Sequence, residues 1–273
     1  MNAQRRYGLL AAVGVFLVVT LFPVYWAIVA SFTPETRLFA APSLLPTEIV
    51  RDHYYALFAE RDFWTPIRNS LVVAGTTTLF CVTVGALCAY ALARLRFRWK
   101  VPILGLILAV TMFPQISLVP PLYLLLRAFH LINTYPGLIF PYVTFAMPLT
   151  VWLLVGFFRQ LPHELEEAAM VDGAGRLRML WEIILPLAMP GVATTAILTF
   201  VYCWNEFLFA FTFTLGPERY TAPVAIALFR GQYQVSWGQV LAAAVIATAP
   251  VTLLILLFQQ RIVQGLTAGA VKG

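Results

Sequence analysis

Long apolar stretches separated by polar connections dominate the pattern of this chain. There are six such runs, and Glu206 in the fifth is the one charged residue inside them. A helix needs about 20 mainly apolar residues to cross a bilayer, whereas barrel strands alternate apolar and polar residues. The pattern therefore predicts an all-α integral membrane protein with six transmembrane helices in a single transmembrane domain, residues 1–273. The expected spans are 8–32, 69–93, 101–126, 135–158, 187–217 and 231–260.

Composition excludes a soluble fold. Hydrophobic residues make up 61% of the chain, charged residues make up 11%, and the mean hydropathy is +0.83. These values leave too little polar surface to cover a soluble globule. Arg5 and Arg6 precede the first apolar run, as they would in a cleaved signal peptide. That run is longer than a signal core, and no small-residue cleavage pattern follows it before "SFTPETR", so we expect it to be a span.

Lysine and arginine are unevenly distributed between the connections. Positive residues are retained on the cytoplasmic side of a membrane. With the N-terminus inside, eleven of these residues fall in cytoplasmic segments and seven in outer segments, and "RLRFRWK" at 94–100 is the densest group. We therefore expect both termini to be cytoplasmic. The net charge of +6 follows from this topology and gives no reason to invoke nucleic acid.

The connection at 159–186 carries an unusual number of charges for this chain. It includes "EEAAMVDGAGRLRMLWEIILP", in which apolar residues recur at helical spacing on both sides of "DGAG". Asp172 and Gly173 suit a chain reversal, because Asp bonds nearby backbone and Gly tolerates positive φ. We expect two short amphipathic helices. The expected apolar faces are Leu161, Leu165, Ala168 and Ala169 in the first, and Leu177, Leu180, Trp181 and Ile184 in the second.

Such a helix pair could lie on the lipid surface or dock on another protein. A lipid-surface helix carries a basic polar face. The first helix here carries Glu164, Glu166 and Glu167 and no Lys or Arg, and the small Ala168 and Ala169 allow close approach by another protein. These features favour protein docking.

The same residues resemble the EAA loop of the membrane subunits of bacterial ABC importers. Glu167-Ala168-Ala169 is followed after three residues by Gly173, and after nine more by Ile183, one residue, Leu185 and Pro186. The resemblance extends through "RNSLVVAG", "CAYALARLRF", "TMFPQISLVPPLYLLLRAFHLINTYPGLI" and "WNEFLFAFT". These segments look like MalG-type permease subunits of carbohydrate importers, and "RIVQGLTAGAVKG" looks most like members for trehalose or maltose.

The resemblance implies a type I ABC importer (MetI-like) transmembrane domain in the bacterial cytoplasmic membrane, with residues 159–186 as a cytoplasmic coupling loop. It also implies several partners: a second homologous permease subunit, two ATPase subunits or a homodimeric ATPase, an external sugar-binding protein, and membrane lipid. ATP and Mg²⁺ belong to the ATPases and no cofactor to this chain, which contains no G-x-x-x-x-G-K-[ST] motif. We therefore expect a transport subunit and not an enzyme. The expected ATPase-coupling residues are Glu166, Glu167, Ala168, Ala169, Asp172, Gly173 and Pro186.

Polar side chains inside the fifth apolar run are candidates for the substrate pathway, because polar groups are costly against lipid. Thr195, Thr199, Tyr202 and Glu206 recur at helical spacing, with Asn205 adjacent. Hydroxyl and amide groups beside aromatic rings suit a sugar. The alternative is that these groups bond across neighbouring helices and hold the bundle together, and the sequence leaves both interpretations open.

Two further regions have expected roles. Prolines interrupt the third and fourth runs, so these helices should be buried or kinked at a cavity. In the family the connection between the fifth and sixth spans faces the external sugar-binding protein, which implies a receptor-facing loop containing Tyr220, Arg230, Tyr233 and Trp237.

Other chemistries fit the sequence less well, and the substrate has one alternative. "HELEE" from His163 begins like a zinc-protease H-E-x-x-H motif but ends in Glu167, so we expect no metal site. An ion-coupled secondary transporter normally needs several intramembrane ionisable groups, and Glu206 is isolated. We expect a disaccharide such as trehalose or maltose, and glycerol-3-phosphate or another glycoside remains the alternative substrate.

Overall fold

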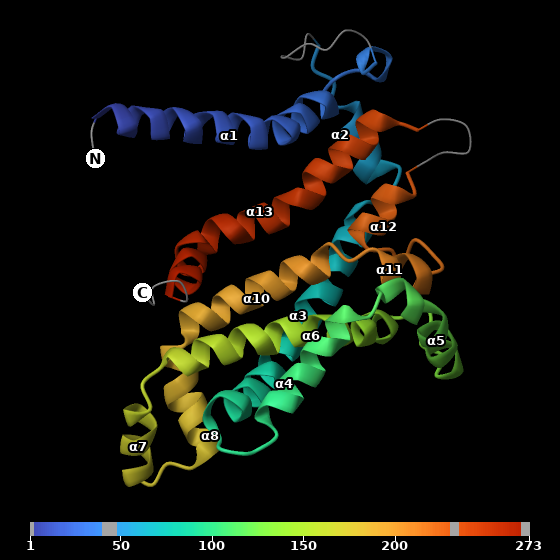
Figure 1. The fold of residues 1–273 in the computed structure, drawn as a ribbon. Helices are drawn as coiled ribbons and strands as arrows, with labels where there is room; N and C mark the ends of the chain where they lie inside the picture. The colour runs from blue at the N-terminus through green and yellow to red at the C-terminus, as the bar shows by residue number, and fades with distance from the viewer. Residues whose placement is uncertain (1–2, 40–47, 230–234, 269–273) are drawn as a thin grey trace. The chain divides into compact units, whose positions relative to one another are not determined.

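The computed structural model describes residues 3–39, 48–229 and 235–268 of the chain. These residues are mostly helical and include no β-strand (Figure 1), so the prediction of an all-α chain is confirmed. The α-helices are α1 (Ala3–Ser31), α2 (Asp52–Ala59), α3 (Trp64–Arg94), α4 (Lys100–Ala109), α5 (Gln115–Ala128), α6 (Tyr135–Gln160), α7 (Glu164–Val171), α8 (Arg176–Met179), α9 (Leu185–Leu187), α10 (Met189–Trp204), α11 (Leu208–Phe213), α12 (Ala222–Ala227) and α13 (Trp237–Ala268). Short 3-10 helices cover Glu35–Arg37 and Val110–Met112, and a π-helix covers Leu180–Ile184.

Four of the described helices, α1, α3, α6 and α13, are long and apolar enough to cross a membrane. Two bent pairs raise the number of candidate spans to six. The first pair bends by 94° between Lys100–Met112 and Gln115–Ala128. Phe113 at this bend has an extended backbone. Pro114 follows it, and a residue before proline is pushed out of the helical region. The second pair bends by 83° between Arg176–Leu187 and Met189–Trp204.

The helical part of the fifth apolar run is shorter than its composition alone indicates. Helix α10 ends at Trp204, and α11 begins at Leu208. Asn205 and Glu206 lie in the break, and both side chains bond nearby backbone groups. Such local bonds compete with the helical hydrogen-bond ladder, so they account for the interruption.

The described residues form two compact units, of which the first comprises Met1–Trp64 and Ala225–Pro250. In this unit the Ser31 hydroxyl lies 2.7 Å from the Tyr54 hydroxyl, and the Phe32 and Tyr54 rings are 4.9 Å apart. The Glu35 carboxylate accepts hydrogen bonds from the backbone amides of Trp237 at 2.8 Å and Gly238 at 3.0 Å. These amides open α13 and lack helical acceptors, so Glu35 caps that helix.

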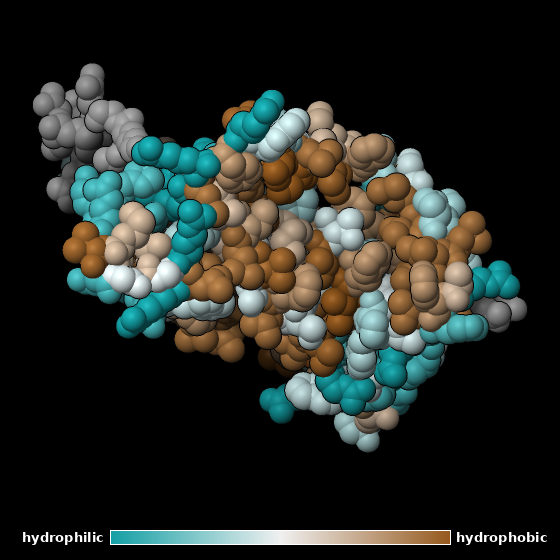
Figure 2. Space-filling model, turned by 90° about the horizontal axis from the view of Figure 1, so that it is seen from below, coloured by the Kyte–Doolittle hydropathy of each residue, from teal (hydrophilic) through white to brown (hydrophobic). Residues whose placement is uncertain are grey.

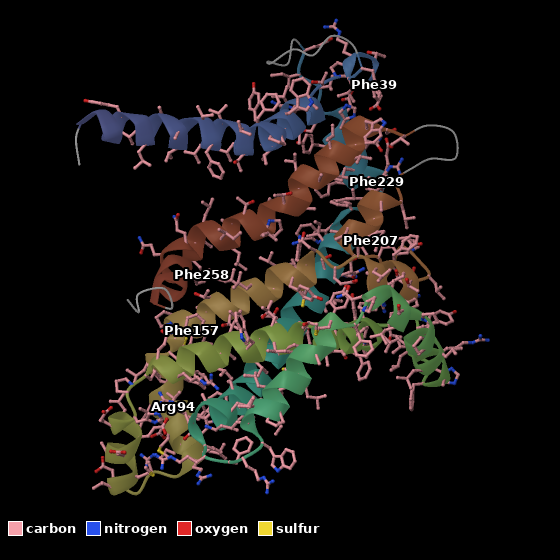
Figure 3. All side chains as sticks on the ribbon, in the orientation of Figure 1. Phe39, Arg94, Phe157, Phe207, Phe229 and Phe258 are labelled. Atoms are coloured by element: carbon pink, nitrogen blue, oxygen red, sulfur yellow. The ribbon has the colours of Figure 1, made fainter. Side chains whose placement is uncertain are left out.

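The second unit comprises Thr65–Val224 and Val251–Gly273. Its α6 is the most buried of the four long apolar helices, and α10 packs along it. The hydroxyls of Thr150 on α6 and Thr199 on α10 lie 2.9 Å apart. A Cβ added to Gly191 on α10 would lie 2.4 Å from Cγ of Phe157, so glycine is what permits this close approach. Figure 3 labels Phe157 at this contact.

Large apolar side chains remain exposed on the helix surfaces. On α1, Val15, Phe16 and Val18 are each about two-thirds exposed. Figure 2 shows many apolar residues exposed on the face that it presents. Soluble proteins rarely expose apolar surface of this extent, so these surfaces suit contact with lipid or with other membrane subunits.

Candidate functional site

The segment expected to be the coupling loop, residues 159–186 and called the coupling loop below, turns sharply after α7. Gly173 has φ +77°. Its amide donates to the Met170 carbonyl, and the Ala174 amide donates to the Ala169 carbonyl at 2.9 Å. This pair of bonds is a Schellman motif, in which a left-handed residue satisfies the last carbonyls of a helix. Glycine at 173 therefore meets a backbone requirement.

The inner face of α7 differs from the expected apolar face. Glu166 and Ala169 are the buried residues of this helix, whereas Leu165 and Ala168 are exposed. Glu166 is buried because its Oε1 lies 3.2 Å from Nε of Arg94, the last residue of α3. The ion pair rotates the helix away from the orientation that apolar periodicity predicts.

The outer face of α7 combines carboxylates with exposed apolar side chains. Glu167, Ala168, Asp172 and Gly173 are all exposed. Val171 is 88% exposed and Met170 is 56% exposed, both beside the turn. The expected coupling residues of α7 and its turn therefore divide into two groups, because Glu166 and Ala169 face the chain itself while the others are exposed.

The second half of the coupling loop is anchored in the core. Leu180 and Ile184 are fully buried and belong to a cluster with Leu154 and Phe158 of α6 and with Ala86 and Tyr90 of α3. Leu177 and Trp181, expected on the same face, are 65% and 51% exposed. The π-helical turn at Leu180–Ile184 changes the spacing of side chains around the axis, so the α-helical pattern does not identify the buried face.

Pro186 lies in this anchored half of the loop. It lines an apolar pocket of about 250 Å³ together with Val82 and Ala86 of α3 and Trp181. Its position follows from the "LP" ending of the motif, since proline fits the first turn of α9. Pro186 is exposed and lies beside α3, in the half of the loop that follows the turn at Gly173.

Two of the expected pathway residues on α10 have their bonds inside the helix packing. Thr195 and Thr199 are both fully buried. The Thr195 hydroxyl donates to the Gly191 carbonyl at 2.9 Å, and the Thr199 hydroxyl pairs with that of Thr150. The Thr199 bond joins α10 to α6, which is the structural alternative in which hydroxyl groups hold neighbouring helices together, whereas the Thr195 bond lies within α10.

The other three expected pathway residues lie at or just after the last turn of α10. Tyr202 accepts a hydrogen bond at 2.7 Å from the Gln115 amide, which belongs to the first residue of α5. Asn205 is exposed, and its amide donates to the Val201 carbonyl. The Glu206 carboxylate accepts bonds from the amides of Phe209 and Ala210 at the start of α11. Gln115 was not among the expected residues, although "FPQ" after an apolar run signals a polar group at a helix break.

The connection after α11 is held by a buried amide. Asn69, fully buried on α3, donates to the backbone carbonyls of Glu218 at 3.0 Å and Tyr220 at 2.9 Å, and it accepts from the Tyr135 hydroxyl. The Asn133 amide donates to the Glu218 carboxylate at 2.7 Å and lowers the pKa of that carboxyl from its ordinary value. Tyr220 is therefore fixed through its backbone.

Of the remaining expected receptor-facing residues, the structure describes only Trp237. The amide of Trp237 is capped by Glu35 in the first unit. Arg230 and Tyr233 lie outside the described residues.

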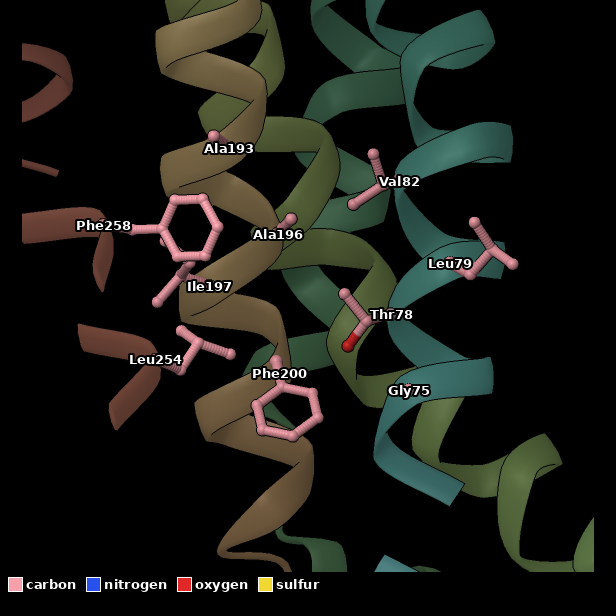
Figure 4. A pocket seen from close by; sticks show the side chains of 10 residues that line it. All are labelled: Gly75, Thr78, Leu79, Val82, Ala193, Ala196, Ile197, Phe200, Leu254 and Phe258. Atoms are coloured by element: carbon pink, nitrogen blue, oxygen red, sulfur yellow. The ribbon is translucent and has the colours of Figure 1, made fainter. Parts of the chain in front are cut away.

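An apolar pocket of about 390 Å³ lies between α3, α10 and the part of α13 that includes Leu254 and Phe258 (Figure 4). Thr78 is the one polar side chain among the described residues that line it. A sugar buries many hydroxyl groups, and each unpaired one is costly. This pocket therefore suits an apolar group and does not suit a sugar.

Comparison with known proteins gives consistent matches. Residues 81–268 match the family described as "Binding-protein-dependent transport system inner membrane component". The chain is 42% identical over 278 residues to the trehalose/maltose transport system permease protein MalG of Thermococcus litoralis, covering 100% of both chains. It is 44% identical over 255 residues to the trehalose transport system permease protein SugB of Mycobacterium tuberculosis, covering 93% of each.

A solved structure has the same fold. It is described as a bacterial ABC transporter involved in the import of the acidic polysaccharide alginate, and one of its chains superposes with a TM-score of 0.80. The match covers 95% of this chain and 98% of that chain, at 22% identity. The predicted MetI-like permease fold is confirmed by these matches.

Proposed function

This chain belongs to the family of binding-protein-dependent transport system inner membrane components, and we propose that it is the permease subunit of an ATP-driven importer for a disaccharide such as trehalose or maltose. Two partner ATPase subunits, identical or different, bind ATP and Mg²⁺ and hydrolyse the nucleotide. A second homologous permease subunit completes the path, and an external sugar-binding protein delivers the sugar. Both termini lie in the cytoplasm.

The outer face of α7 is the observation that carries this proposal. Val171 and Met170 expose apolar surface beside the carboxylates of Glu167 and Asp172. Exposed apolar groups rimmed by charges are typical of protein interfaces, and the carboxylates disfavour anionic lipid. We propose that Glu167, Ala168, Met170, Val171, Asp172 and Gly173 dock on an ATPase subunit.

We propose that the sugar path lies at two helix breaks, one between α4 and α5 and the other between α10 and α11. The Gln115–Tyr202 hydrogen bond joins the start of α5 to the last turn of α10. Non-helical backbone at membrane depth is tolerated where it is buried in protein or lines a water-filled cavity, and transporter binding sites are commonly formed by discontinuous helices. Exposed Asn205 and the stacked rings of Phe207 and Phe211, 5.2 Å apart, lie at the same break. Amide, hydroxyl and aromatic groups together suit a sugar.

Transport by the reconstituted complex tests the proposed function. Proteoliposomes containing both permease subunits, the ATPases and the sugar-binding protein should accumulate labelled trehalose or maltose. Accumulation should require ATP on the side of the membrane where the ATPases are bound. Competition by unlabelled glycerol-3-phosphate distinguishes the alternative substrate. Accumulation driven by a proton or sodium gradient in the absence of nucleotide contradicts the proposal.

A further inference from the structure

Arg94 holds three separate points of the segment that leads into α7. Its Nη2 donates to the Leu161 carbonyl at 2.7 Å, its Nη1 lies 3.1 Å from Nδ1 of His163, and its Nε lies 3.2 Å from Oε1 of Glu166. The guanidinium thus contacts the residue after α6, the residue before α7 and the first turn of α7. Figure 3 labels Arg94 at this end of the bundle.

The Arg94–Glu166 ion pair is buried, unlike the other ion pair of the coupling loop. Side-chain exposure is 1% for Arg94 and 11% for Glu166, against 65% and 60% for Arg178 and Glu182. The desolvation free energy of two buried charges can offset the electrostatic attraction between them. Such a pair is therefore weak as a source of stability, and its geometry fixes one element against another.

The two halves of the coupling loop are attached to the chain by different means. The half after the turn is embedded through Leu180 and Ile184 in an apolar cluster. The half before it, α7, buries only Glu166 and Ala169 among its described residues. Polar contacts of Arg94 therefore attach α7 to the end of α3. Helix α7 carries the proposed docking face.

We propose that Arg94 is a positioning residue that makes α7 and α3 move as one body, so that displacement of the docked loop reaches the membrane-spanning part through the Arg94–Glu166 ion pair. This inference rests on the proposed function, because it takes α7 as the element that an ATPase displaces. It assigns Glu166 to a contact within the chain and leaves the exposed Glu167 for the partner.

Distances between α7 and α3 in the assembled complex test the inference directly. Spin labels are placed at Glu164, exposed on α7, and at Leu87, 41% exposed on α3, after Cys81, Cys88 and Cys203 are replaced. The distance distribution is measured without nucleotide and after trapping with ATP and vanadate, so no sugar is needed. We expect the wild-type distribution to be narrow and unchanged between the two states, and the Glu166→Gln distribution to broaden on trapping.

Glu182→Gln is the matched control, because it removes a carboxylate from an exposed pair on the same loop and exposed pairs contribute little. It should behave as the wild type does. If Glu166→Gln does not accumulate, Arg94→Met with Glu166→Met leaves no unpaired buried charge and should show the same broadening. In the absence of vanadate, the sugar-loaded binding protein should no longer stimulate ATP hydrolysis by complexes that contain Glu166→Gln or the double methionine variant. The ATPase subunits should still co-purify with both variants.

The outcomes separate the two proposals. Failure of the ATPase subunits to co-purify with the wild-type chain contradicts the proposed function. Co-purification together with identical distance distributions in wild type and Glu166→Gln overturns the role of Arg94 and leaves the proposed function intact.

Discussion

One carboxylate oxygen of Glu206 lies 2.8 Å from the amide nitrogen of Phe209, so the charged residue of the fifth apolar run caps the helix that follows it. Its second oxygen lies 3.1 Å from the amide of Ala210. The first amides of a helix have no partner within the helix, and the Glu206 carboxylate supplies acceptors for two of them. The presence of a lone carboxylate here is explained without assigning it a transported proton.

Replacement of Glu206 should therefore affect stability more than coupling. Glu206→Gln keeps an acceptor oxygen and should retain ATP-dependent uptake with no requirement for a proton gradient. Glu206→Ala leaves both amides unpaired, at about 1 to 3 kcal/mol each. Thermal unfolding of the purified complex and uptake in the presence of a protonophore measure the two effects. Abolition of wild-type uptake by the protonophore at constant ATP would contradict this account.

The contact between α6 and α10 depends on the absence of a side chain at Gly191. In Gly191→Ala the new Cβ would meet the Phe157 ring at 2.4 Å, and overpacking of this kind costs about 1 to 3 kcal/mol. Gly156→Ala, one residue from Phe157, is the control because its Cβ would meet nothing within 4 Å. Thermal stability should fall for the first variant only. Equal stability of the two would show that the helices separate without cost.

Asn69 fixes the connection that includes Tyr220. Asn69→Ala leaves the carbonyls of Glu218 and Tyr220 and the Tyr135 hydroxyl without this partner, and each lost hydrogen bond is worth about 0.5 to 1.5 kcal/mol net. Tyr135→Phe removes only one of these bonds and should be milder. Binding of the sugar-binding protein to the reconstituted complex should weaken more for Asn69→Ala. An equal loss in both variants would argue against the amide as the main support.

Apolar run length and charge composition were enough to predict an all-α membrane protein, because burial in lipid leaves few alternatives. They did not predict where the fifth run breaks. Apolar composition continues to Pro217, yet α10 ends at Trp204 because Asn205 and Glu206 bond local backbone. A run of apolar residues reports the environment of a segment, and the hydrogen bonds of two polar residues decide its helical limits.

The inner face of α7 could not be found from apolar periodicity. Its buried residue Glu166 is charged, and its partner Arg94 is distant in sequence and was counted as a topology signal in "RLRFRWK". The pairing depends on tertiary contact. One signal was available, because Glu166 and Ala169 are three residues apart and so share a helix face, which left Glu167 on another face.

We predict the orientation of the chain in the membrane from the charge distribution. Single cysteines at Ser236 and Gly175, in a background without Cys81, Cys88 and Cys203, should react from opposite sides. Only Ser236→Cys should be labelled by an impermeant reagent in intact cells, because Gly175 lies in the proposed cytoplasmic loop. Labelling of both from outside is incompatible with six spans.

The turn at Gly173 should be the most sensitive point of the coupling loop. Gly173→Asp forces a side chain into φ +77° and adds a negative charge beside Asp172. Positive φ is strained for residues other than glycine, although a Cβ here meets nothing within 4 Å of the chain itself. The apolar spans are untouched, so the variant should insert normally while uptake and receptor-stimulated ATP hydrolysis are lost.

Gly175→Asp separates the backbone requirement from the added charge. Gly175 has φ −72° and precedes α8 as its N-cap, a position that aspartate favours, and its Cβ also meets nothing within 4 Å. This variant should retain most uptake, and Glu167→Ala, which removes one proposed contact and leaves the turn intact, should lie between the two. The measurement is uptake and stimulated hydrolysis in membranes with matched amounts of the chain. If Gly173→Asp and Gly175→Asp behave alike, charge and not the left-handed turn governs docking; if neither changes uptake, the loop does not dock on an ATPase, and a helix pair on the lipid surface becomes the better explanation of "EEAAMVDGAG".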